Sequence, residues 1–341
     1  MVKIAVIGAG FMGRTHAEAY SRIGLAQVAA VCDKDRALGE KFAEDFGCSF
    51  YEDFDAMVKD CEFEVADICL PTFLHREFAV RAAEQGKHVF CEKPAALNVE
   101  SLDCMIEAAR KAGVRLMIGQ VVRFWPEYRT AKQMYDQGEL GALNYAYGAR
   151  LSEHPAWSQW YRRPENSGGG LFDLHLHDVD FFCWMFGQAE SVFASGTKNE
   201  LGCWNFVNST LNFASGQSAS VQGVIEMTKG YPFTMELRLV GSQATYEYIM
   251  KAGANLEDVA SARRDTRVYS QEGARLLPMD ETDAYETELR HFVECISENR
   301  DSEVIPAAQA RKVMCVMEAL KTSLETGKQV IVDYGERKLP D

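Results

Sequence analysis

The segment that decides the fold runs Lys3-Ile4-Ala5-Val6-Ile7-Gly8-Ala9-Gly10-Phe11-Met12-Gly13. An apolar run leads into three glycines, and a helical pattern follows from Arg14 to Arg22. Between a strand and a helix, Gly8 permits a tight turn, Gly10 lets the backbone approach a pyrophosphate, and Gly13 lets the helix pack closely on the strand. The N–H groups that start the helix then face the phosphates. We predict a dinucleotide-binding turn whose cofactor contacts are Gly8, Gly10, Phe11, Met12 and Gly13.

An acidic residue closes the second strand-like run. Asp33 lies twenty residues beyond Gly13, where a carboxylate accepts hydrogen bonds from the adenosine ribose hydroxyls. The same carboxylate repels a 2′-phosphate, although Lys34 and Arg36 soften that repulsion. The alternative interpretation is a solvated aspartate at a strand end. We expect Asp33 to bind the cofactor, and NAD to be preferred to NADP.

Short apolar runs alternate with helical patterns over the first 120 residues, which is typical of parallel strands joined by helical crossovers. The runs are continuously apolar, as expected for strands covered on both faces. The predicted strands span residues 3–7, 27–32, 49–51, 65–70, 87–91 and 115–119, and the predicted helices span 36–46, 74–85 and 99–112. Residues 1–120 are therefore expected to form an α/β dinucleotide-binding domain.

From residue 121 the pattern changes to one helix followed by strands that read as a mostly antiparallel sheet. The helix is predicted at 126–137 and the strands at 143–151, 190–197, 203–214, 217–227, 233–240 and 243–249. Turn signals stand at 214–217 and 241–242. We interpret residues 251–282 as a long loop and predict two helices at 283–299 and 306–326. Residues 121–341 are expected to form a second, α+β domain, to which the family resemblance described below assigns substrate binding and oligomerisation.

Composition excludes several classes of protein. The chain has 341 residues, 47% hydrophobic and 25% charged, which is too apolar for a disordered protein. The formal charge of −14, with no basic cluster, argues against nucleic acid and anionic membranes as partners. None of the ten cysteines forms a Cys-x-x-Cys pair, so reduced thiols are favoured over disulfides. Without a signal-peptide pattern or a long apolar run, we expect a cytoplasmic protein.

Polar residues follow two further predicted strands of the first domain. Pro71 and Thr72 come after the fourth strand, with Thr72 expected to cap the next helix, and Glu92-Lys93-Pro94 follow the fifth. Both positions lie at the carboxyl ends of parallel strands, where open α/β sheets bind ligands. We expect Pro71, Thr72, Glu92 and Lys93 to contact the cofactor and the Lys93–Pro94 bond to be cis. His75 is also assigned to the cofactor, although a histidine near a helix start is more often satisfied within the helix, as we expect for His16.

In the second domain, three glycines at 168–170 precede a helical pattern that carries Asp173, His177 and Asp180. Asp173 and His177 are i, i+4 neighbours on a helix. Their residue types suit proton transfer, and the alternative is a structural hydrogen-bonded pair. His175 points to another face and is interpreted as a packing residue.

Together these features resemble the Gfo/Idh/MocA family, the glucose–fructose oxidoreductase and inositol dehydrogenase group of NAD(P)-dependent enzymes. The resemblance covers most of the chain and rests on 8–13, 71–72, 92–94 and 168–180. It implies a Rossmann domain followed by a domain whose open sheet forms homodimers or homotetramers. It also implies that Lys93, Asp173 and His177 form the catalytic set. Gly230-Tyr231 resembles a substrate-lining pair of the inositol dehydrogenase branch, which adds Tyr231 to the substrate residues.

Hydride transfer from a secondary alcohol requires a base for the hydroxyl proton, and a histidine has a suitable pKa. His177 is the candidate base, Asp173 would stabilise its protonated form, and Lys93 would hydrogen-bond the reacting oxygen. Which of Lys93 and His177 takes the proton first stays open. Arg123 is a further substrate-binding candidate. We expect an NAD-dependent dehydrogenase of a cyclic polyol or sugar.

Three rival interpretations remain. A metal-dependent hydrolase would use Asp173, His175, His177 and Asp180, but on a helix His175 and His177 cannot converge on one ion, so we expect no metal. A non-catalytic NAD-binding sensor could share the same scaffold. A reductase of a different sugar or carbonyl compound would keep the scaffold and the catalytic residues.

Overall fold

The computed structural model describes residues 1–154, 160, 163–253 and 262–335. The chain divides into two compact units, one formed by Met1–Phe124 with Thr282–Arg311 and the other by Trp125–Glu281 with Lys312–Asp341. This division differs from the predicted boundary, because residues 282–311 pack with the N-terminal unit rather than the second domain. Within the described ranges, no helix is long and apolar enough to cross a lipid bilayer.

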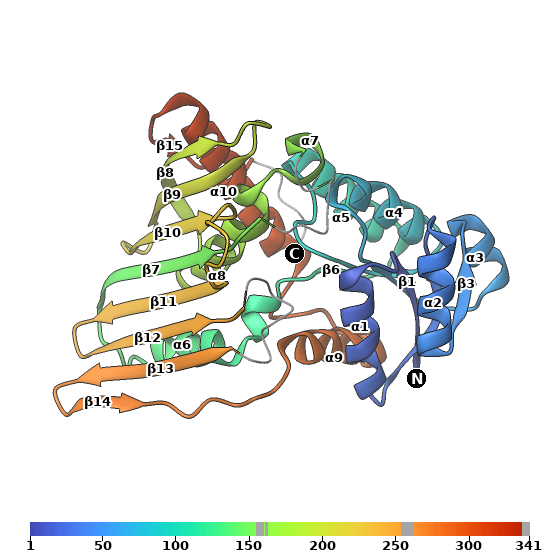
Figure 1. The fold of residues 1–341 in the computed structure, drawn as a ribbon, viewed down its shortest axis with the longest axis horizontal. Helices are drawn as coiled ribbons and strands as arrows, with labels where there is room; N and C mark the ends of the chain where they lie inside the picture. The colour runs from blue at the N-terminus through green and yellow to red at the C-terminus, as the bar shows by residue number, and fades with distance from the viewer. Residues whose placement is uncertain (155–159, 161–162, 254–261, 336–341) are drawn as a thin grey trace. The chain divides into compact units, whose positions relative to one another are not determined.

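The first unit is built on a six-stranded parallel sheet with the strand order β3-β2-β1-β4-β5-β6 (Figure 1). Its strands are β1 (Val2–Ile7), β2 (Ala26–Cys32), β3 (Ser49–Tyr51), β4 (Val65–Ile68), β5 (His88–Cys91) and β6 (Leu116–Ile118). Its helices are α1 (Phe11–Arg22), α2 (Arg36–Phe46), α3 (Phe54–Asp60), α4 (Thr72–Glu84), α5 (Val99–Ala112), the 3₁₀ turn η1 (Val121–Phe124) and α9 (Ala284–Ser297). The strand order reverses between β1 and β4, and this reversal is the switch point where doubly wound sheets bind ligands.

The sequence explains why these strands and helices form where they do. Ile4, Ala5 and Val6 are fully buried, as expected of a central strand covered on both faces. Helices α2 and α5 begin at side-chain caps, because Asp35 accepts from the N–H of Leu38 and Asn98 accepts from that of Ser101. All six predicted strands of this sheet are confirmed within one or two residues, and the Rossmann fold is confirmed with them.

The second unit carries a nine-stranded sheet with the order β14-β13-β12-β11-β7-β10-β9-β8-β15. Its strands are β7 (Leu143–Leu151), β8 (Ala189–Lys198), β9 (Trp204–Phe213), β10 (Ser218–Val224), β11 (Thr234–Gly241), β12 (Ala244–Lys251), β13 (Arg263–Ser270), β14 (Gly273–Leu276) and β15 (Val330–Ile331). Its helices are α6 (Pro126–Asp136), α7 (Pro164–Ser167), the π-helical turn η3 (Leu171–His175) and α8 (Leu176–Phe186). Helix α10 (Ala307–Thr326) contains the boundary between the units.

The mostly antiparallel sheet is confirmed, with two differences from the prediction. Strands β7 and β10 pair in parallel, while the other pairs are antiparallel. The segment expected to be a long loop contains β13 and β14, whose charged residues hid the strand pattern. Part of that expected loop, 254–261, lies outside the described residues.

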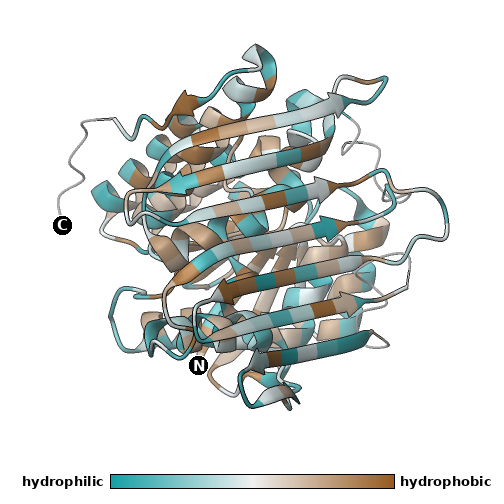
Figure 2. Cartoon of the chain, turned by 90° about the vertical axis from the view of Figure 1, so that its left-hand side faces the viewer, coloured by the Kyte–Doolittle hydropathy of each residue, from teal (hydrophilic) through white to brown (hydrophobic). Residues whose placement is uncertain are grey.

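The nine-stranded sheet has one buried face and one open face. Figure 2 colours its strands by hydropathy, and apolar and polar residues are mixed along them. Strand β9 illustrates the alternation, because Val207 and Leu211 are fully buried while Phe206 and Asn208, on either side of Val207, are exposed. Helix α8 packs against β7 and β10. Exposed aromatic side chains on the sheet include Tyr145, Phe193 and Tyr269.

Candidate functional site

The glycine turn after β1 leaves no room for larger residues at two of its positions. Gly8 has φ +109°, and a Cβ there would lie 2.7 Å from the carbonyl oxygen of Cys69. A Cβ on Gly13 would lie 1.9 Å from the carbonyl oxygen of Gly8, so α1 can approach the turn only with glycine at this position. A Cβ on Gly10 would meet nothing within 4 Å. The turn is therefore tight at Gly8 and Gly13 and open at Gly10.

Helix α1 starts at this opening without a side-chain cap. Gly10 is its N-cap residue and has no side chain with which to cap the helix, and the first turn of the helix holds no acidic residue. Phe11 and Met12 form that first turn, with Phe11 exposed and Met12 half-buried. An uncapped helix start with open space beside Gly10 suits a phosphate group.

Asp33 is turned toward the same glycine turn. Its Oδ2 accepts from the N–H of Ala9 at 2.7 Å, and its Oδ1 accepts from the N–H of Asp35 at 2.8 Å. A carboxylate has about four acceptor sites, so both oxygens retain capacity for ribose hydroxyls. The cradle at Gly10, the uncapped helix and the acid beside them fit an adenine dinucleotide.

The turn after β4 differs from the prediction in two respects. Pro71 is the N-cap residue of α4, and Thr72 is its buried first residue, so the expectation that Thr72 caps this helix is wrong. The ring nitrogens of His75 lie 2.9 Å from the carbonyl oxygen of Pro94 and 2.7 Å from that of Leu70. The polar atoms of buried His75 therefore face the protein backbone, which makes this residue a link between two loops rather than a cofactor contact.

The segment after β5 carries the predicted catalytic lysine. The Lys93–Pro94 bond is cis, as predicted. Glu92 is buried, and its Oε2 accepts from the backbone N–H of Lys93 at 3.0 Å. Lys93 itself is half-buried. The backbone N–H of Lys93 is thus held by the side-chain carboxylate of the residue that precedes it.

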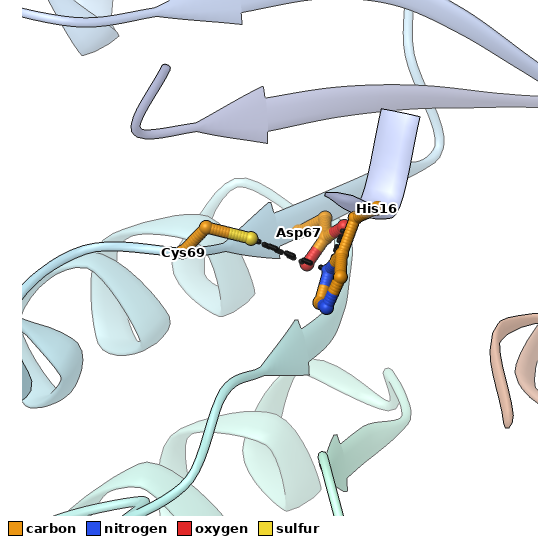
Figure 3. A group of neighbouring side chains, drawn as sticks. All are labelled: His16, Asp67 and Cys69. Atoms are coloured by element: carbon orange, nitrogen blue, oxygen red, sulfur yellow. Dashed lines mark hydrogen bonds and ion pairs between the residues drawn. The ribbon is translucent and has the colours of Figure 1, made fainter. Parts of the chain in front are cut away.

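Three side chains of the first unit, His16, Asp67 and Cys69, form a cluster that was not predicted as part of the site. His16 of α1 and Asp67 of β4 are both fully buried, with His16 Nδ1 and Asp67 Oδ2 2.9 Å apart (Figure 3). Cys69 lies 3.3 Å from the same ring nitrogen and donates to Asp67 Oδ1 at 3.5 Å. These three side chains offer ligand atoms within 4.8 Å of one another, but hydrogen bonds among them account for the arrangement.

In the second unit, the three glycines bring the start of helix α8 close to the sheet. Gly168 and Gly169 have φ values of +73° and +69°, and the N–H of Gly170 donates to Asn205 Oδ1 at 2.8 Å. A Cβ on Gly170 would lie 2.9 Å from Ile225 Cγ2. The π-helical turn follows directly, so Asp173 lies in a wider turn than the predicted α-helix. Such π-turns occur frequently at functional sites.

Side chains of this helix separate into two faces. His175 lies toward the sheet, where its Nε2 is 2.7 Å from Ser209 Oγ. Asp178 also lies toward the sheet, and its Oδ2 accepts a hydrogen bond from Arg150 Nε at 3.0 Å. At about 3.6 residues per turn, His177 and Asp180 fall on a different face of α8 from Asp178. Asp173, His177 and Asp180 are all buried. The contact of His175 with Ser209 agrees with its interpretation as a packing residue, whereas the pairing of Asp173 with His177 stays a prediction.

The sheet accommodates these polar side chains through glycines that sequence reasoning missed. A Cβ on Gly223 of β10 would lie 3.0 Å from His175 Cβ, and a Cβ on Gly148 of β7 would lie 3.1 Å from Asp178 Cβ. Glycine inside a strand pattern signals close approach by another group, and this signal was available in the sequence. Burial lowers the pKa of His175 to about 3, so this histidine is neutral in the folded chain.

The two further substrate candidates differ in their surroundings. Arg123 belongs to the first unit and is 1% exposed, and its Nη1 donates to the carbonyl oxygen of Val304 at 2.6 Å and to Gln309. These contacts identify Arg123 as an anchor for the 282–311 segment, and we withdraw it from the substrate residues. Tyr231 is half-buried in the loop between β10 and β11.

Two segments of the chain match described families. Residues 2–120 match the GFO/IDH/MocA oxidoreductase family with an NAD-binding Rossmann fold, and residues 128–247 match the GFO/IDH/MocA C-terminal domain. The chain belongs to the GFO/IDH/MocA oxidoreductase family. Its N-terminal unit is accordingly an NAD-binding Rossmann domain, as the glycine turn and Asp33 predict.

Relatives in the GFO/IDH/MocA family carry more than one activity. Myo-inositol 2-dehydrogenase of Thermotoga maritima is 28% identical over 96% of this chain and 98% of that protein. The 2,7-anhydro-N-acetylneuraminate hydratase of Mediterraneibacter gnavus is 31% identical over 57% of this chain, and the match spans about half, 52%, of its length. A levoglucosan dehydrogenase solved in complex with NADH has the same fold, with a TM-score of 0.83 at 23% identity over 97% of this chain and 99% of the other.

Proposed function

We propose that this chain is an NAD-dependent dehydrogenase that oxidises a secondary hydroxyl of a cyclic polyol or sugar. The observation that carries the proposal is the turn at Gly10, which has open space beside it and lies next to the Asp33 carboxylate. Membership of an oxidoreductase family and full-length similarity to an inositol dehydrogenase support the reaction class.

The chain supplies several groups to the cofactor. The first N–H groups of α1, at Phe11 and Met12, would hold the pyrophosphate, and Asp33 would accept from the adenosine ribose hydroxyls. Pro71, Thr72 and Glu92 lie at the carboxyl ends of β4 and β5, at the ligand-binding edge of the sheet. When bound, NAD supplies the carbon that accepts the hydride. Because Asp33 disfavours a 2′-phosphate, NADP is the weaker cofactor.

The chemistry on the substrate side is assigned to three residues. The His177 imidazole accepts the hydroxyl proton at a ring nitrogen, and the Asp173 carboxylate stabilises the resulting imidazolium. The Lys93 ammonium donates a hydrogen bond to the substrate oxygen and stabilises the negative charge that develops there. Tyr231 is proposed to line the substrate position. Each of these groups does its part without a metal ion.

A substrate screen tests this proposal. Purified protein is incubated with NAD or NADP and with inositols, aldoses and anhydro-sugars, and reduced nicotinamide is followed by absorbance. We expect NAD-dependent oxidation of at least one cyclic polyol or sugar, with a higher kcat/KM for NAD than for NADP. Failure to bind NAD, measured by calorimetry, would contradict the proposal outright. Binding of NAD without turnover of any substrate class would favour the sensor alternative.

Water addition or elimination on a sugar is the second candidate function. It is supported by the 31% identity to the anhydro-sugar hydratase over 57% of this chain, whereas the 28% identity to the inositol dehydrogenase extends over 96% of it. The two candidates differ in cofactor balance, because a dehydrogenase accumulates NADH whereas a hydratase converts its substrate with no net NADH. Chromatography of the sugar products beside the absorbance assay separates them. Reduction of a carbonyl substrate is detected in the same screen by running it with NADH.

The open face of the nine-stranded sheet is the proposed site of oligomerisation. Tyr145, Phe193, Phe206 and Tyr269 are aromatic residues exposed on the strands of this sheet, and a second subunit packed on the open face would bury them. We expect a homodimer or homotetramer by light scattering on a sizing column. A Phe206→Arg variant should dissociate the oligomer, and a monomeric wild type would contradict this assignment.

None of the ten cysteines, all within the described residues, is in a disulfide. Because reduced cysteines are typical of the cytoplasm, a cytoplasmic location remains our proposal.

A further inference from the structure

His16 is a fully buried histidine whose two ring nitrogens both meet carboxylates. Its Nδ1 lies 2.9 Å from Asp67 Oδ2, and its Nε2 lies 3.1 Å from Glu92 Oε1. The three residues come from α1, from β4 and from the end of β5. The ring therefore joins the helix that follows the glycine turn to two strand ends at the ligand-binding edge of the sheet.

This geometry requires two N–H donors on one imidazole. A neutral ring has a single N–H, so one of its two carboxylate contacts would set lone pairs against each other. Burial alone would lower the pKa of His16, but the Asp67 charge and hydrogen bond outweigh it and the pKa lies well above its usual value. His16 is accordingly an imidazolium shared by two carboxylates.

The other ionisable groups around His16 leave that charge in place. They are Tyr20 on the same helix, Cys69 and Glu92 after β4 and β5, and Tyr285 and Glu288 on α9. Burial and the Glu92 charge raise the pKa of Glu288 well above its usual value, which favours its neutral carboxyl form. Burial raises the pKa of the Cys69 thiol strongly as well. Two carboxylates, on Asp67 and Glu92, then face one imidazolium.

The bridge continues to the catalytic lysine through Glu92. While Glu92 Oε1 faces the ring, Glu92 Oε2 accepts from the backbone N–H of Lys93 at 3.0 Å. On the other side of the lysine, the carbonyl of Pro94 meets His75 at 2.9 Å. Glu92 also has little freedom to turn away, since a Cβ on Gly119 would already lie 3.1 Å from its Oε1. The main chain on both sides of Lys93 is thus held by buried side chains.

We propose that His16 is a positioning residue for Lys93, acting as a charged bridge from Asp67 to the Glu92 carboxylate that fixes the lysine main chain. Its effect on turnover rests on the proposed function, whereas its effect on the Lys93 amide does not. A histidine that only filled space would leave both unchanged when replaced by a side chain of similar size.

The first experiment measures hydrogen exchange of the Lys93 amide by NMR on protein labelled with ¹⁵N-lysine. In His16→Gln the charge is gone, the Glu92 carboxylate loses its partner, and exchange at Lys93 should rise about tenfold or more, as expected for loss of one hydrogen bond. The matched control is His88→Gln, because His88 is a half-buried histidine at the opposite end of β5. It should leave Lys93 exchange unchanged. Equal exchange in wild type and His16→Gln would overturn the proposal.

A second variant guards against failure of His16→Gln to fold. Glu92→Gln keeps the size of the side chain but leaves one acceptor oxygen for two donors, the ring N–H and the Lys93 N–H. It too should raise Lys93 exchange, and unchanged exchange in this variant counts equally against the proposal.

Kinetics with the substrate found in the screen give the second readout. Each single variant should lower kcat by about 10- to 100-fold, the usual effect of misplacing a reacting group by about 1 Å. In His16→Gln, which changes no residue assigned to the cofactor, the KM for NAD should change less than threefold. Because His16 and Glu92 act along one path, the double variant should lose no more than the worse single variant. Additive losses would overturn the proposal. If no substrate is turned over but Lys93 exchange responds, the proposed function fails and the bridge stands.

Discussion

Two alanine substitutions in the glycine turn should separate its structural role from its binding role. In Gly13→Ala the new Cβ would lie 1.9 Å from the Gly8 carbonyl oxygen and 3.1 Å from the Gly8 carbonyl carbon. Ordinary contacts of this kind are about 3.4 Å, so α1 and the turn must separate by roughly 1.5 Å, and both partners are backbone. We expect the free energy of unfolding to fall by about 1–3 kcal/mol, the usual cost of overpacking, and NAD affinity to fall as well.

Gly10→Ala should behave in the opposite way. Its Cβ meets nothing within 4 Å, and its φ of −70° suits any residue. Stability should be unchanged or higher by about 0.4–1 kcal/mol, because alanine restricts the unfolded chain. The methyl group would nevertheless occupy the space where the pyrophosphate approaches the helix start. Losing one charge-assisted hydrogen bond costs about 1.5–3 kcal/mol, so the Kd for NADH should rise about 10- to 100-fold.

Urea denaturation and titration of NADH fluorescence measure the two quantities on the same samples. Gly24→Ala, in the loop between α1 and β2, is the matched control, since its Cβ also meets nothing within 4 Å. It should leave the Kd for NADH unchanged and should alter stability no more than Gly10→Ala does. The reasoning is refuted if Gly10→Ala binds NADH as tightly as the wild type, or if Gly13→Ala is as stable as Gly10→Ala.

Three further predictions follow from other residues. Asp33→Ser should shift the ratio of kcat/KM values toward NADP, and an unchanged ratio would remove Asp33 from cofactor selection. His175 is neutral when folded and titrates near 6.5 when unfolded, so the unfolded chain binds the extra proton and stability falls as pH drops below 6.5. The proton uptake by His175 should lower the free energy of unfolding by about 2 kcal/mol between pH 6.5 and 5, and His175→Gln should remove most of this decrease. Parallel curves of unfolding free energy against pH for the wild type and the variant would contradict this. Asp178→Asn leaves the buried Arg150 guanidinium without its counter-charge and should cost about 3–5 kcal/mol in urea denaturation, whereas a cost under 1 kcal/mol would show that the pair is not needed.

Local signals in the sequence were enough to predict most of the fold. Strand β1 reads as a continuous apolar run because both its faces are covered, and this pattern is visible without any tertiary information. Strand β13 could not be found in this way. Its residues Arg263, Asp265 and Arg267 are charged because most of its side chains face water, and only pairing with β12 makes the segment a strand.

The site was predictable where function depends on local backbone geometry. Gly8 and Gly13 have the roles that their spacing indicates, and the contact of His175 with Ser209 agrees with its predicted role as a packing residue. The bridge at His16 could not be predicted, because Asp67 and Glu92 lie 51 and 76 residues away along the chain. Parallel strand order brings them together.

The packing of the first unit also explains the revised boundary. From the sequence alone, Arg123 was a candidate for substrate binding. Its partner is the main chain at Val304, which lies far along the sequence in a segment that returns to the first unit. Sequence order alone assigns that segment to the second domain, and only long-range contacts show otherwise.

The most direct test of the proposed chemistry compares turnover with cofactor binding in Lys93→Ala and His177→Ala. With the preferred substrate of the screen, each variant should lower kcat by about 10²-fold or more, while its Kd for NADH stays within a few-fold of the wild type. Turnover close to that of the wild type in both variants would contradict the assignment of these residues to hydride transfer.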